Sequence, residues 1–428
     1  MSKLQALAGG GYSTGFGSYY MTQAVASGYV AIETDGGHTP GPEASLSPRD
    51  WALTSPGNVN LYLLQDYASR SLGELSPIGK AITESYYNIK PKFSCFTGCS
   101  EGGRQGLLMA QRYPDSFDGI LALAPAVYLQ RFIPAGYWAS QVMNDLGVFP
   151  PPCEIEAFTQ AAIDTCDKLD GVEDGIIGVP HLCNFSAHSM VGQSFSCNGI
   201  ERRFTAGAAS VVQAAWTGPG LGKTGWFGLE KDTPLTSFYV KTGCSPNGTC
   251  AVTSHEIISD WIVHFLAKDP NSDLTTMSDK EYFAYLQLSN IEYSSMLSTA
   301  NTDLSRFRTA GGKMITWHGL ADDIVPPKGP TTYYQQVLET DPHAAEYYRF
   351  YEAPGVRHCF GGPGPVPYNA SDALVAWVEK GTAPETLNAT GSNGVSRPLC
   401  PYPSRQIYAG ADASESSSFR CVPESVAL

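Results

Sequence analysis

The chain has 428 residues, of which 43% are hydrophobic and 16% charged, with a formal net charge of −14 and a pI near 5.0. This composition is typical of a folded globular protein that is large enough for an extensive core and for more than one structural unit. The negative charge argues against nucleic acid or an anionic membrane as a partner, and the sequence contains no apolar run as long as a membrane span.

The cysteine content indicates the compartment in which the protein functions. Eleven cysteines, with 44 glycines and 30 prolines, are typical of a loop-rich protein from an oxidising, extracellular compartment. Four N-x-S/T sequons agree with secretion, with acceptors at Asn184, Asn247, Asn369 and Asn388. Residues 1–8 do not form a convincing signal peptide, because their apolar stretch is too short. We therefore expect a secreted protein whose N-terminus is missing or misassigned in this chain.

The first predicted elements are a glycine-rich loop over residues 9–15, a helix over 16–27, a strand over 29–34 and a helix over 58–68. The glycine-rich loop has two interpretations. It is either a flexible terminus or, through a backbone amide such as that of Gly10, a second donor to an oxyanion.

A candidate nucleophile follows the next predicted strand. Residues 98–102 read Gly-Cys-Ser-Glu-Gly, between a β-branched and aromatic run and a good helix sequence. This G-x-S-x-G pattern is typical of a nucleophile elbow, in which glycines leave room for a strained turn. Ser100 is therefore the candidate nucleophile, and the amide of Glu101, at the start of the helix, is a candidate oxyanion donor.

The following segments predict the fold class. An apolar run at 119–125 is typical of a buried parallel strand, and strand, helix and strand in this order form a right-handed βαβ unit of an α/β sheet. From about residue 129 to 305 strand signals disappear and aromatic residues accumulate, which indicates an insertion that covers the sheet as a lid. We expect an α/β-hydrolase core in two parts, 1–128 and 306–428, with the lid at 129–305 between them.

An acidic loop lies within the predicted lid. Asp167, Asp170 and Asp174 are separated by glycines and concentrate carboxylate oxygens in one tight turn. Hard cations such as Ca²⁺ take six to eight oxygen ligands, so the loop favours a structural calcium site over a solvated acidic turn. Cys166 and Cys183 bracket the loop and could lock it.

The acid and the base of a catalytic triad are expected after the last two core strands, predicted at 313–318 and 348–351. Asp322 and Asp323 follow the first of these strands and compete for the role of the acid. His358 follows the second strand and a Pro-Gly turn, which gives the chain order Ser, Asp, His.

Cysteines adjoin both reactive residues, because Cys99 precedes Ser100 and Cys359 follows His358. Catalysis requires the serine oxygen and an imidazole nitrogen within about 3 Å of each other. Their sequence neighbours would then lie near the Cα separation of about 5.5–6 Å that a disulfide needs. We therefore expect a Cys99–Cys359 bond between nucleophile and base.

Four motifs together resemble the tannase and feruloyl esterase family over nearly all of the chain. They are Gly-Cys-Ser-x-Gly-Gly-Arg-Gln-Gly, Cys-Asp-x-Leu-Asp-Gly-Val-x-Asp-Gly-Ile, His-Gly-x-x-Asp and His-Cys-x-Gly-Gly-x-Gly. Members of that family are secreted α/β-hydrolases with a lid, a calcium ion in the lid and a triad braced by a disulfide. The resemblance implies that Ser100 is the nucleophile, Asp322 the acid and His358 the base.

The resemblance also implies how the calcium ion is held, through the side chains of the three aspartates and the backbone carbonyls of Val172 and Ile176. Three local disulfides are expected, namely Cys166–Cys183, Cys244–Cys250 and Cys400–Cys421. The family has early strands before the glycine-rich loop, so we expect an incomplete sheet. Cys95, Cys153 and Cys197 have no assigned partner, and the odd count of cysteines requires at least one free thiol.

The leading hypothesis is a serine esterase that forms an acyl-enzyme and releases hydroxycinnamic acids of the ferulate type from esters of plant cell-wall polysaccharide such as xylan. The alternative within the family is a tannase that hydrolyses gallate esters. A different class is a truncated, non-catalytic homologue that binds aromatic or glycan ligands, and a chain too truncated to fold is a third possibility.

Overall fold

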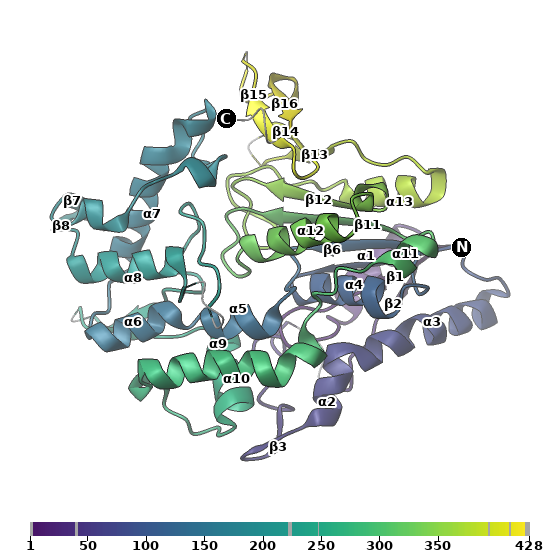
Figure 1. Cartoon of the computed structure of the whole chain (residues 1–428), viewed down its shortest axis with the longest axis horizontal. Helices are drawn as coiled ribbons and strands as arrows, with labels where there is room; N and C mark the ends of the chain where they lie inside the picture. The colour runs from purple at the N-terminus through teal and green to yellow at the C-terminus, as the bar shows by residue number, and fades with distance from the viewer. Residues whose placement is uncertain are drawn as a thin grey trace.

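The computed structural model describes residues 3–38, 42–220, 225–246, 248–392, 394–410 and 412–423. At its centre lies a parallel sheet of six strands in the order β12-β11-β6-β5-β1-β2 (Figure 1). The strands are β1 (Lys3–Leu7), β2 (Val30–Ile32), β5 (Phe93–Cys99), β6 (Gly119–Leu123), β11 (Lys313–Gly319) and β12 (Tyr348–Ala353). The predicted α/β class with a parallel sheet is thus confirmed.

Strand β1 was not predicted. The sequence pattern indicates no strand in residues 3–7, yet Leu4 and Ala6 are fully buried and β1 pairs with both β5 and β2. Lys3, Gln5 and Ala6 have no strong β preference, so the strand signal is weak, and only the pairing on both sides makes this segment a strand.

Helices cover both faces of the sheet because successive residues of a strand point to opposite faces. Ile120 packs with α3 (Ser71–Tyr87), α4 (Glu101–Arg112), α11 (Ser305–Thr309) and α12 (Lys328–Thr340) in one cluster. Its neighbour Leu121 packs with α13 (Ala370–Lys380) in another. The helix α1 (Ser18–Ala26) contacts the edge strand β2.

The helix predicted over 58–68 is wrong at both ends. Asn58–Val59 forms β4, which pairs with β3 (Leu53–Ser55), and the helix α2 (Leu61–Gln65) starts only after Asn60, whose side chain accepts from the amide of Leu63. A π-helical turn, η1 (Asp66–Arg70), then joins α2 directly to α3. The pattern of apolar spacing changes at this turn, which hid the continuity of the helix.

The segment between β6 and β11 is mostly helical and lies beside the sheet in Figure 1. Its longer elements are α5 (Leu129–Ala135), α6 (Trp138–Leu146), α7 (Pro152–Cys166), α8 (Ala206–Thr217), α9 (Glu256–Trp261), η5 (Ile262–Ala267) and α10 (Asp279–Leu297). The expectation that it has no strands is wrong, because it contains two short hairpins, β7 (Ser194–Cys197) with β8 (Ile200–Arg203) and β9 (Thr242–Cys244) with β10 (Cys250–Val252).

One hydrophobic cluster joins this segment to the start of the chain. Tyr12, Trp51 and Tyr67 pack with Trp261 and Phe265 in a single cluster of buried side chains. Most members of this cluster belong to the 129–305 segment, and it is distinct from the two clusters formed around the sheet. The helices therefore have a core of their own, against which residues of the early connections pack. The division at residues 128/129 and 305/306 stays a prediction.

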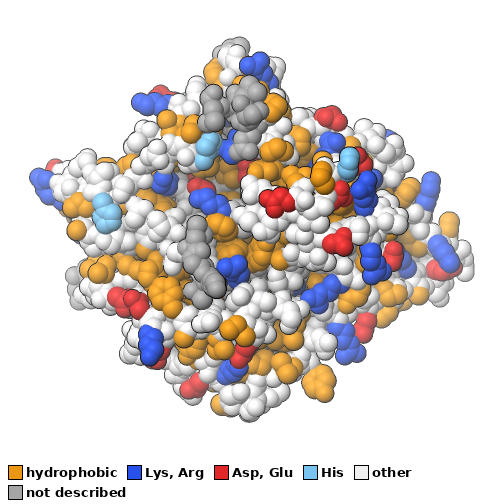
Figure 2. Space-filling model, viewed as in Figure 1, with side chains coloured by type: hydrophobic (Ala, Val, Ile, Leu, Met, Phe, Trp, Pro, Cys, Tyr) orange, Lys and Arg blue, Asp and Glu red, His pale blue; other side chains and the backbone are white. Residues whose placement is uncertain are grey.

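The C-terminal part adds two hairpins to the core, β13 (Leu387–Thr390) with β14 (Ser396–Leu399) and β15 (Arg405–Tyr408) with β16 (Phe419–Val422). The short 3-10 helices are η2 (Asp167–Asp170), η3 (Pro180–Leu182), η4 (Ala187–Met190), η6 (Leu274–Thr276), η7 (Ala344–Glu346) and η8 (Ser416–Ser418). Among the described helices, none combines the length and the apolar character that crossing a bilayer requires. On the face shown in Figure 2, acidic and basic side chains are interspersed.

Candidate active site

Ser100 occupies the tight turn between β5 and α4, with φ 65° and ψ −121°. A positive φ is strained for serine, so the surroundings must hold it. Its amide donates to the carbonyl of Leu123 at 3.0 Å, and its carbonyl accepts from the amide of Ala126 at 3.1 Å. These bonds to the end of β6 fix Ser100 at the carboxyl edge of the sheet.

The glycines of the elbow let it pack on the end of β1. A Cβ on Gly98 would lie 2.4 Å from the Cβ of Ala8, and a Cβ on Gly102 would lie 2.6 Å from the carbonyl oxygen of Gly9. Any side chain at these positions would therefore push the elbow away from β1. The same close approach places the glycine-rich loop beside the elbow.

The glycine-rich loop is packed and is not a free terminus. Gly9 and Gly10 are buried, and the Gly10 carbonyl accepts from the amide of Ser13 at 3.0 Å. The Tyr67 hydroxyl donates to the carbonyl of Gly11 at 2.8 Å, which ties the loop to η1. The interpretation as a flexible terminus is thus wrong for the described residues of this loop.

Asp322 lies just past the end of β11, and its carboxylate is fully buried. Its Oδ1 accepts from the amides of Ile324 at 2.9 Å and Val325 at 2.8 Å. His358 places its Nδ1 at 2.9 Å from Oδ2 and 3.0 Å from Oδ1 of this carboxylate. Because Nδ1 faces the acid, the other ring nitrogen points away from it.

Asp323, the competing acid, contacts the backbone of His358 instead of its ring. Its Oδ1 accepts from the amide of His358 at 3.4 Å, and its Oδ2 accepts from the hydroxyl of Ser237 at 2.7 Å. Among the described residues, only Asp322 of the two aspartates forms a hydrogen bond with the imidazole of His358.

A disulfide joins Cys99 to Cys359, with the Cα atoms 6.0 Å apart. One ring nitrogen of His358 and both sulfur atoms lie within 4.8 Å of one another. The bond therefore brings the residue before Ser100 next to the residue after His358, although 260 positions separate the cysteines.

Burial and pairing shift the protonation of the acid and the base in opposite directions. Burial alone raises the pKa of Asp322, but the charge and hydrogen bonds of His358 and a hydrogen bond from His318 outweigh it and hold the pKa below its usual range. Burial lowers the pKa of His358, but the charge and hydrogen bond of Asp322 and the charge of Asp323 together raise it. Asp322 is thus an ionised carboxylate beside an imidazole whose pKa is raised.

Two further contacts in the site could not be predicted from the sequence. The side chain of Glu101 forms a fully buried ion pair with Arg104, at 2.5 Å, and Arg104 also donates to the carbonyls of Ala68 and Leu297 at 3.1 and 3.3 Å. These bonds hold the first turn of α4, which carries the Glu101 amide. The Nε2 of His318 lies 2.9 Å from Oδ2 of Asp322 and 3.0 Å from the carbonyl oxygen of Val325. The only sequence signal for Arg104 and His318 is that each is a fixed residue of a family motif, Gly-Cys-Ser-x-Gly-Gly-Arg-Gln-Gly and His-Gly-x-x-Asp respectively.

The acidic loop is held by backbone amides in this structure. The two oxygens of Asp167 accept from the amides of Asp174 at 3.1 Å and Gly175 at 2.9 Å, and Asp170 accepts from Val172 at 3.0 Å. Cys166 and Cys183 form a disulfide across the base of the loop. Among the described residues, one group of three His, Cys, Asp or Glu side chains has its possible metal-ligand atoms within 4.8 Å of one another, and it consists of Cys99, His358 and Cys359. The three aspartates of the loop therefore do not converge on one point.

The donor set of the loop still suits a cation. Burial, together with the charges of Asp174 and Asp167, raises the pKa of Asp170 to about 6. Arg397 from β14 supplies one counter-charge, with its guanidinium 2.6 Å from Asp174. Half-buried carboxylates that repel each other are oxygen ligands of the kind Ca²⁺ prefers.

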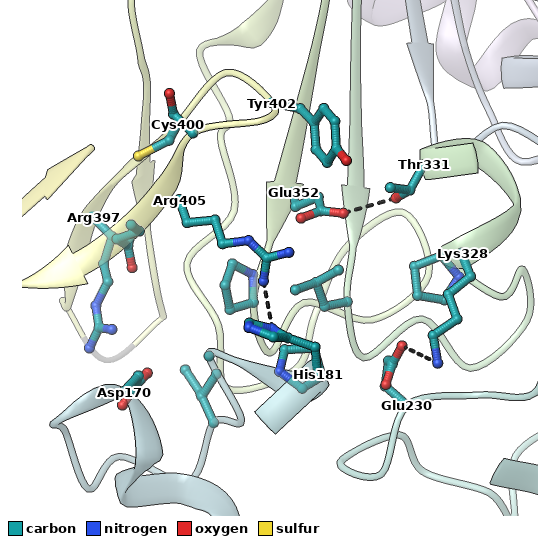
Figure 3. Close-up of a pocket in the computed structure, with 18 residues that line it drawn as sticks. Asp170, His181, Glu230, Lys328, Thr331, Glu352, Arg397, Cys400, Tyr402 and Arg405 are labelled. Carbon is teal, nitrogen blue, oxygen red and sulfur yellow. Dashed lines mark hydrogen bonds and ion pairs between the residues drawn. The ribbon is translucent and has the colours of Figure 1, made fainter. Parts of the chain in front are cut away.

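A cavity of about 200 Å³ lies between this loop, the C-terminal hairpins and the core (Figure 3). Neither Ser100 nor His358 lines it. Charged side chains of both signs point into it, and two of them are paired, Glu230 with Lys328 at 3.0 Å. The cavity is therefore separate from the triad residues.

The other cysteines are nearly all paired. Besides the bonds above, the disulfides are Cys153–Cys197, Cys244–Cys250 and Cys400–Cys421. Cys153 and Cys197, which the sequence left unassigned, are thus partners, and the free thiol belongs to Cys95, whose pKa burial raises to about 12. The sequon acceptors Asn184, Asn369 and Asn388 are exposed, whereas Asn247 lies outside the described residues.

Comparison with known proteins gives consistent results along the whole chain. A family model described as "Tannase and feruloyl esterase" matches residues 3–422. A probable feruloyl esterase of Arthroderma benhamiae is 39% identical over 435 aligned residues, which cover 99% of this chain and 80% of that protein. Among solved structures, a tannin acyl hydrolase from Aspergillus niger gives a TM-score of 0.89 at 26% identity, over 100% of this chain and 82% of the other. Feruloyl esterase B from Aspergillus oryzae gives a TM-score of 0.82 at 26% identity, over 99% and 86%.

Proposed function

This chain belongs to the tannase and feruloyl esterase family and is therefore a carboxylic ester hydrolase, and we propose that it releases hydroxycinnamic acids of the ferulate type from their esters. The family resemblance of the sequence motifs is thereby confirmed. A non-catalytic binding protein is not retained as an alternative.

The observation that carries the proposed mechanism is the buried hydrogen bond of 2.9 Å between Asp322 and His358, next to the disulfide that leads to Ser100. In this mechanism His358 takes the proton of the Ser100 hydroxyl, and the serine oxygen forms a bond to the ester carbonyl carbon. The carbonyl electron pair moves onto its oxygen, where the amides of Glu101 and Gly10 donate hydrogen bonds.

The intermediate then collapses to the acyl-enzyme. The bond to the alcohol oxygen breaks, and His358 gives its proton to the leaving alcohol. Water next loses a proton to His358 and attacks the acyl carbon, which frees the carboxylic acid and returns the proton to Ser100. Asp322 stays ionised throughout and stabilises the imidazolium form of His358.

Two relatives point to different acyl groups. The probable feruloyl esterase shares 39% of its aligned residues with this chain, whereas the tannin acyl hydrolase shares 26% but has the higher TM-score of the two structures compared. We favour ferulate on the greater sequence identity and keep gallate esters as the alternative. The aromatic side chains of the 129–305 segment, as a lid, would form the acyl pocket for either group.

Hydrolysis of methyl ferulate beside methyl gallate tests the proposal. We expect kcat/KM for methyl ferulate to exceed that for methyl gallate, with the Ser100→Ala variant as the blank. A preference for gallate would make the enzyme a tannase. Turnover of neither ester by folded wild-type protein would overturn both substrate assignments.

We also propose that the acidic loop binds a structural calcium ion through Asp167, Asp170 and Asp174, with carbonyls of Val172 and Ile176 as further ligands. The cation would neutralise the mutual repulsion of these carboxylates and stabilise the loop. It would take no part in the ester chemistry.

Secretion is a further part of the proposal. Five disulfides among the described cysteines favour an oxidising compartment, and three exposed sequon acceptors are available for glycosylation. A mass decrease on endoglycosidase treatment of protein secreted by a eukaryotic host would support it.

A further inference from the structure

His318 makes a second contact to the carboxylate that His358 uses. It lies near the end of β11, its side chain is fully buried, and its Nε2 is 2.9 Å from Oδ2 of Asp322. The same Nε2 is 3.0 Å from the carbonyl oxygen of Val325. Both partners are acceptors, so Nε2 must carry a hydrogen.

The other ring nitrogen of His318 indicates its charge. Nδ1 is buried and has no hydrogen-bond partner among the described residues. A hydrogen on Nδ1 would be a buried donor without an acceptor, which costs free energy. The geometry therefore favours the neutral imidazole with its hydrogen on Nε2.

We propose that His318 is a positioning residue of this esterase: it donates from Nε2 to the Asp322 oxygen that His358 also contacts, and so fixes the carboxylate and takes up part of its charge. The inference rests on the proposed function, in which Asp322 and His358 are acid and base. The sequence alone does not assign this role, because the backbone geometry of residues 318–322 decides whether His318 and Asp322 meet.

Sharing the carboxylate has a direct consequence for the base. His318 is one of the groups that hold the pKa of Asp322 low. A carboxylate with one donor fewer attracts the proton of His358 more strongly. Without His318 the base would thus stay protonated to a higher pH, and less of it would be available to deprotonate Ser100.

Other titratable groups face this pair and must be considered. Glu352 in β12 is the register neighbour of His318, and it accepts from the hydroxyl of Thr331 at 2.9 Å. The charges of Asp322 and Asp323, after burial, raise the pKa of Tyr239 in the 129–305 segment. Among the described residues, none of Glu352, Asp323 and Tyr239 forms a hydrogen bond with the His318 side chain.

Two substitutions separate a donor from a merely space-filling role. His318→Leu removes the donor, whereas His318→Gln keeps an amide hydrogen near the position of Nε2. We expect the Leu variant to lose roughly tenfold in kcat with little change in KM, and the acid limb of its pH profile to move to higher pH. We expect the Gln variant to recover most of the kcat and the wild-type acid limb.

His264 provides the matched control, because it is also buried and its Nδ1 also has no partner among the described residues. It lies in η5, away from Asp322. His264→Leu should lower the melting temperature and leave the acid limb in place. Equal losses in both His318 variants, with the acid limb unmoved, would show a structural role only and overturn the proposal. A limb that moves to lower pH would also contradict it.

A spectroscopic measurement on the wild-type enzyme covers the case in which His318→Leu does not fold. In ¹⁵N-histidine NMR spectra of the active enzyme, assigned with His318→Gln, His318 should show its hydrogen on Nε2. A tautomer with the hydrogen on Nδ1 would overturn the proposal. This measurement does not depend on activity. Failure of the proposed function would be seen separately, as activity retained by the Ser100→Ala variant.

Discussion

Cys99 and Cys359 are 260 residues apart in the sequence and share a disulfide, so the covalent bond closes most of the chain around the triad. A cross-link restricts the unfolded chain more when its loop is longer. This bond therefore combines a large effect on stability with a position beside both reactive residues.

The double variant Cys99→Ala, Cys359→Ala should lose about 5 kcal/mol of unfolding free energy and should also lose kcat under conditions where it is folded. Denaturant unfolding and steady-state kinetics measure the two effects. The control is Cys244→Ala, Cys250→Ala, which opens a loop of only 6 residues and should cost about 2 kcal/mol without changing kcat. Unchanged kcat in the first variant would show that the bond does not position the triad.

Replacing Ser100 with alanine should lower kcat by a factor on the order of 10⁵ or more, because no other hydroxyl occupies the elbow. The variant should keep the circular dichroism spectrum of the wild type. Residual turnover above about one per cent of wild type would rule out Ser100 as the nucleophile.

The two adjacent aspartates should differ sharply. Asp322→Asn should lower kcat by about 10³–10⁴, since an amide cannot stabilise the imidazolium form of His358. Asp323→Asn is the matched control and should cost much less, because Asp323 contacts the His358 backbone and Ser237. Similar losses in the two variants would contradict the assignment of the acid.

The pH profile follows from the direction of the shift at His358. Because Asp322 and Asp323 raise its pKa despite burial, kcat/KM should fall on the acid side at a pH above the ordinary histidine value of about 6.5. Asp323→Asn removes one of the raising charges and should move this limb to lower pH. An acid limb of the wild-type kcat/KM profile below pH 6 would contradict the raised pKa of His358.

Removal of calcium should act on stability rather than on chemistry. Chelation by EDTA should lower the melting temperature and leave kcat at 25 °C nearly unchanged, because the loop does not include a triad residue. Asp170→Asn should abolish the response to EDTA. Glu173→Gln, an exposed acidic residue of the same loop, should keep it. A melting temperature that ignores EDTA in the wild type would count against the site.

The local patterns of the sequence predicted much of the site. Glycines at 98 and 102 around Ser100 predict a strained turn, and the structure places a positive φ there. The apolar run at 119–125 predicts the buried strand β6, which spans Gly119–Leu123. These features depend on neighbours in the chain, so a single sequence contains the information.

Other features depend on partners far away in the chain. β1 is a strand because β2 and β5 pair with it, and its five residues alone do not require this. The choice between Asp322 and Asp323 depends on which side chain the turn after β11 directs at His358.

The sequence by itself determined the fold class, the nucleophile turn and the order of the candidate triad, because short-range sterics and hydrophobic periodicity fix them. Only the tertiary structure decided that Cys153 pairs with Cys197, that Glu101 and Arg104 form a buried ion pair, and that His318 meets Asp322. Each of these contacts needs two side chains within a few ångströms, and that distance is set by the packing of whole elements.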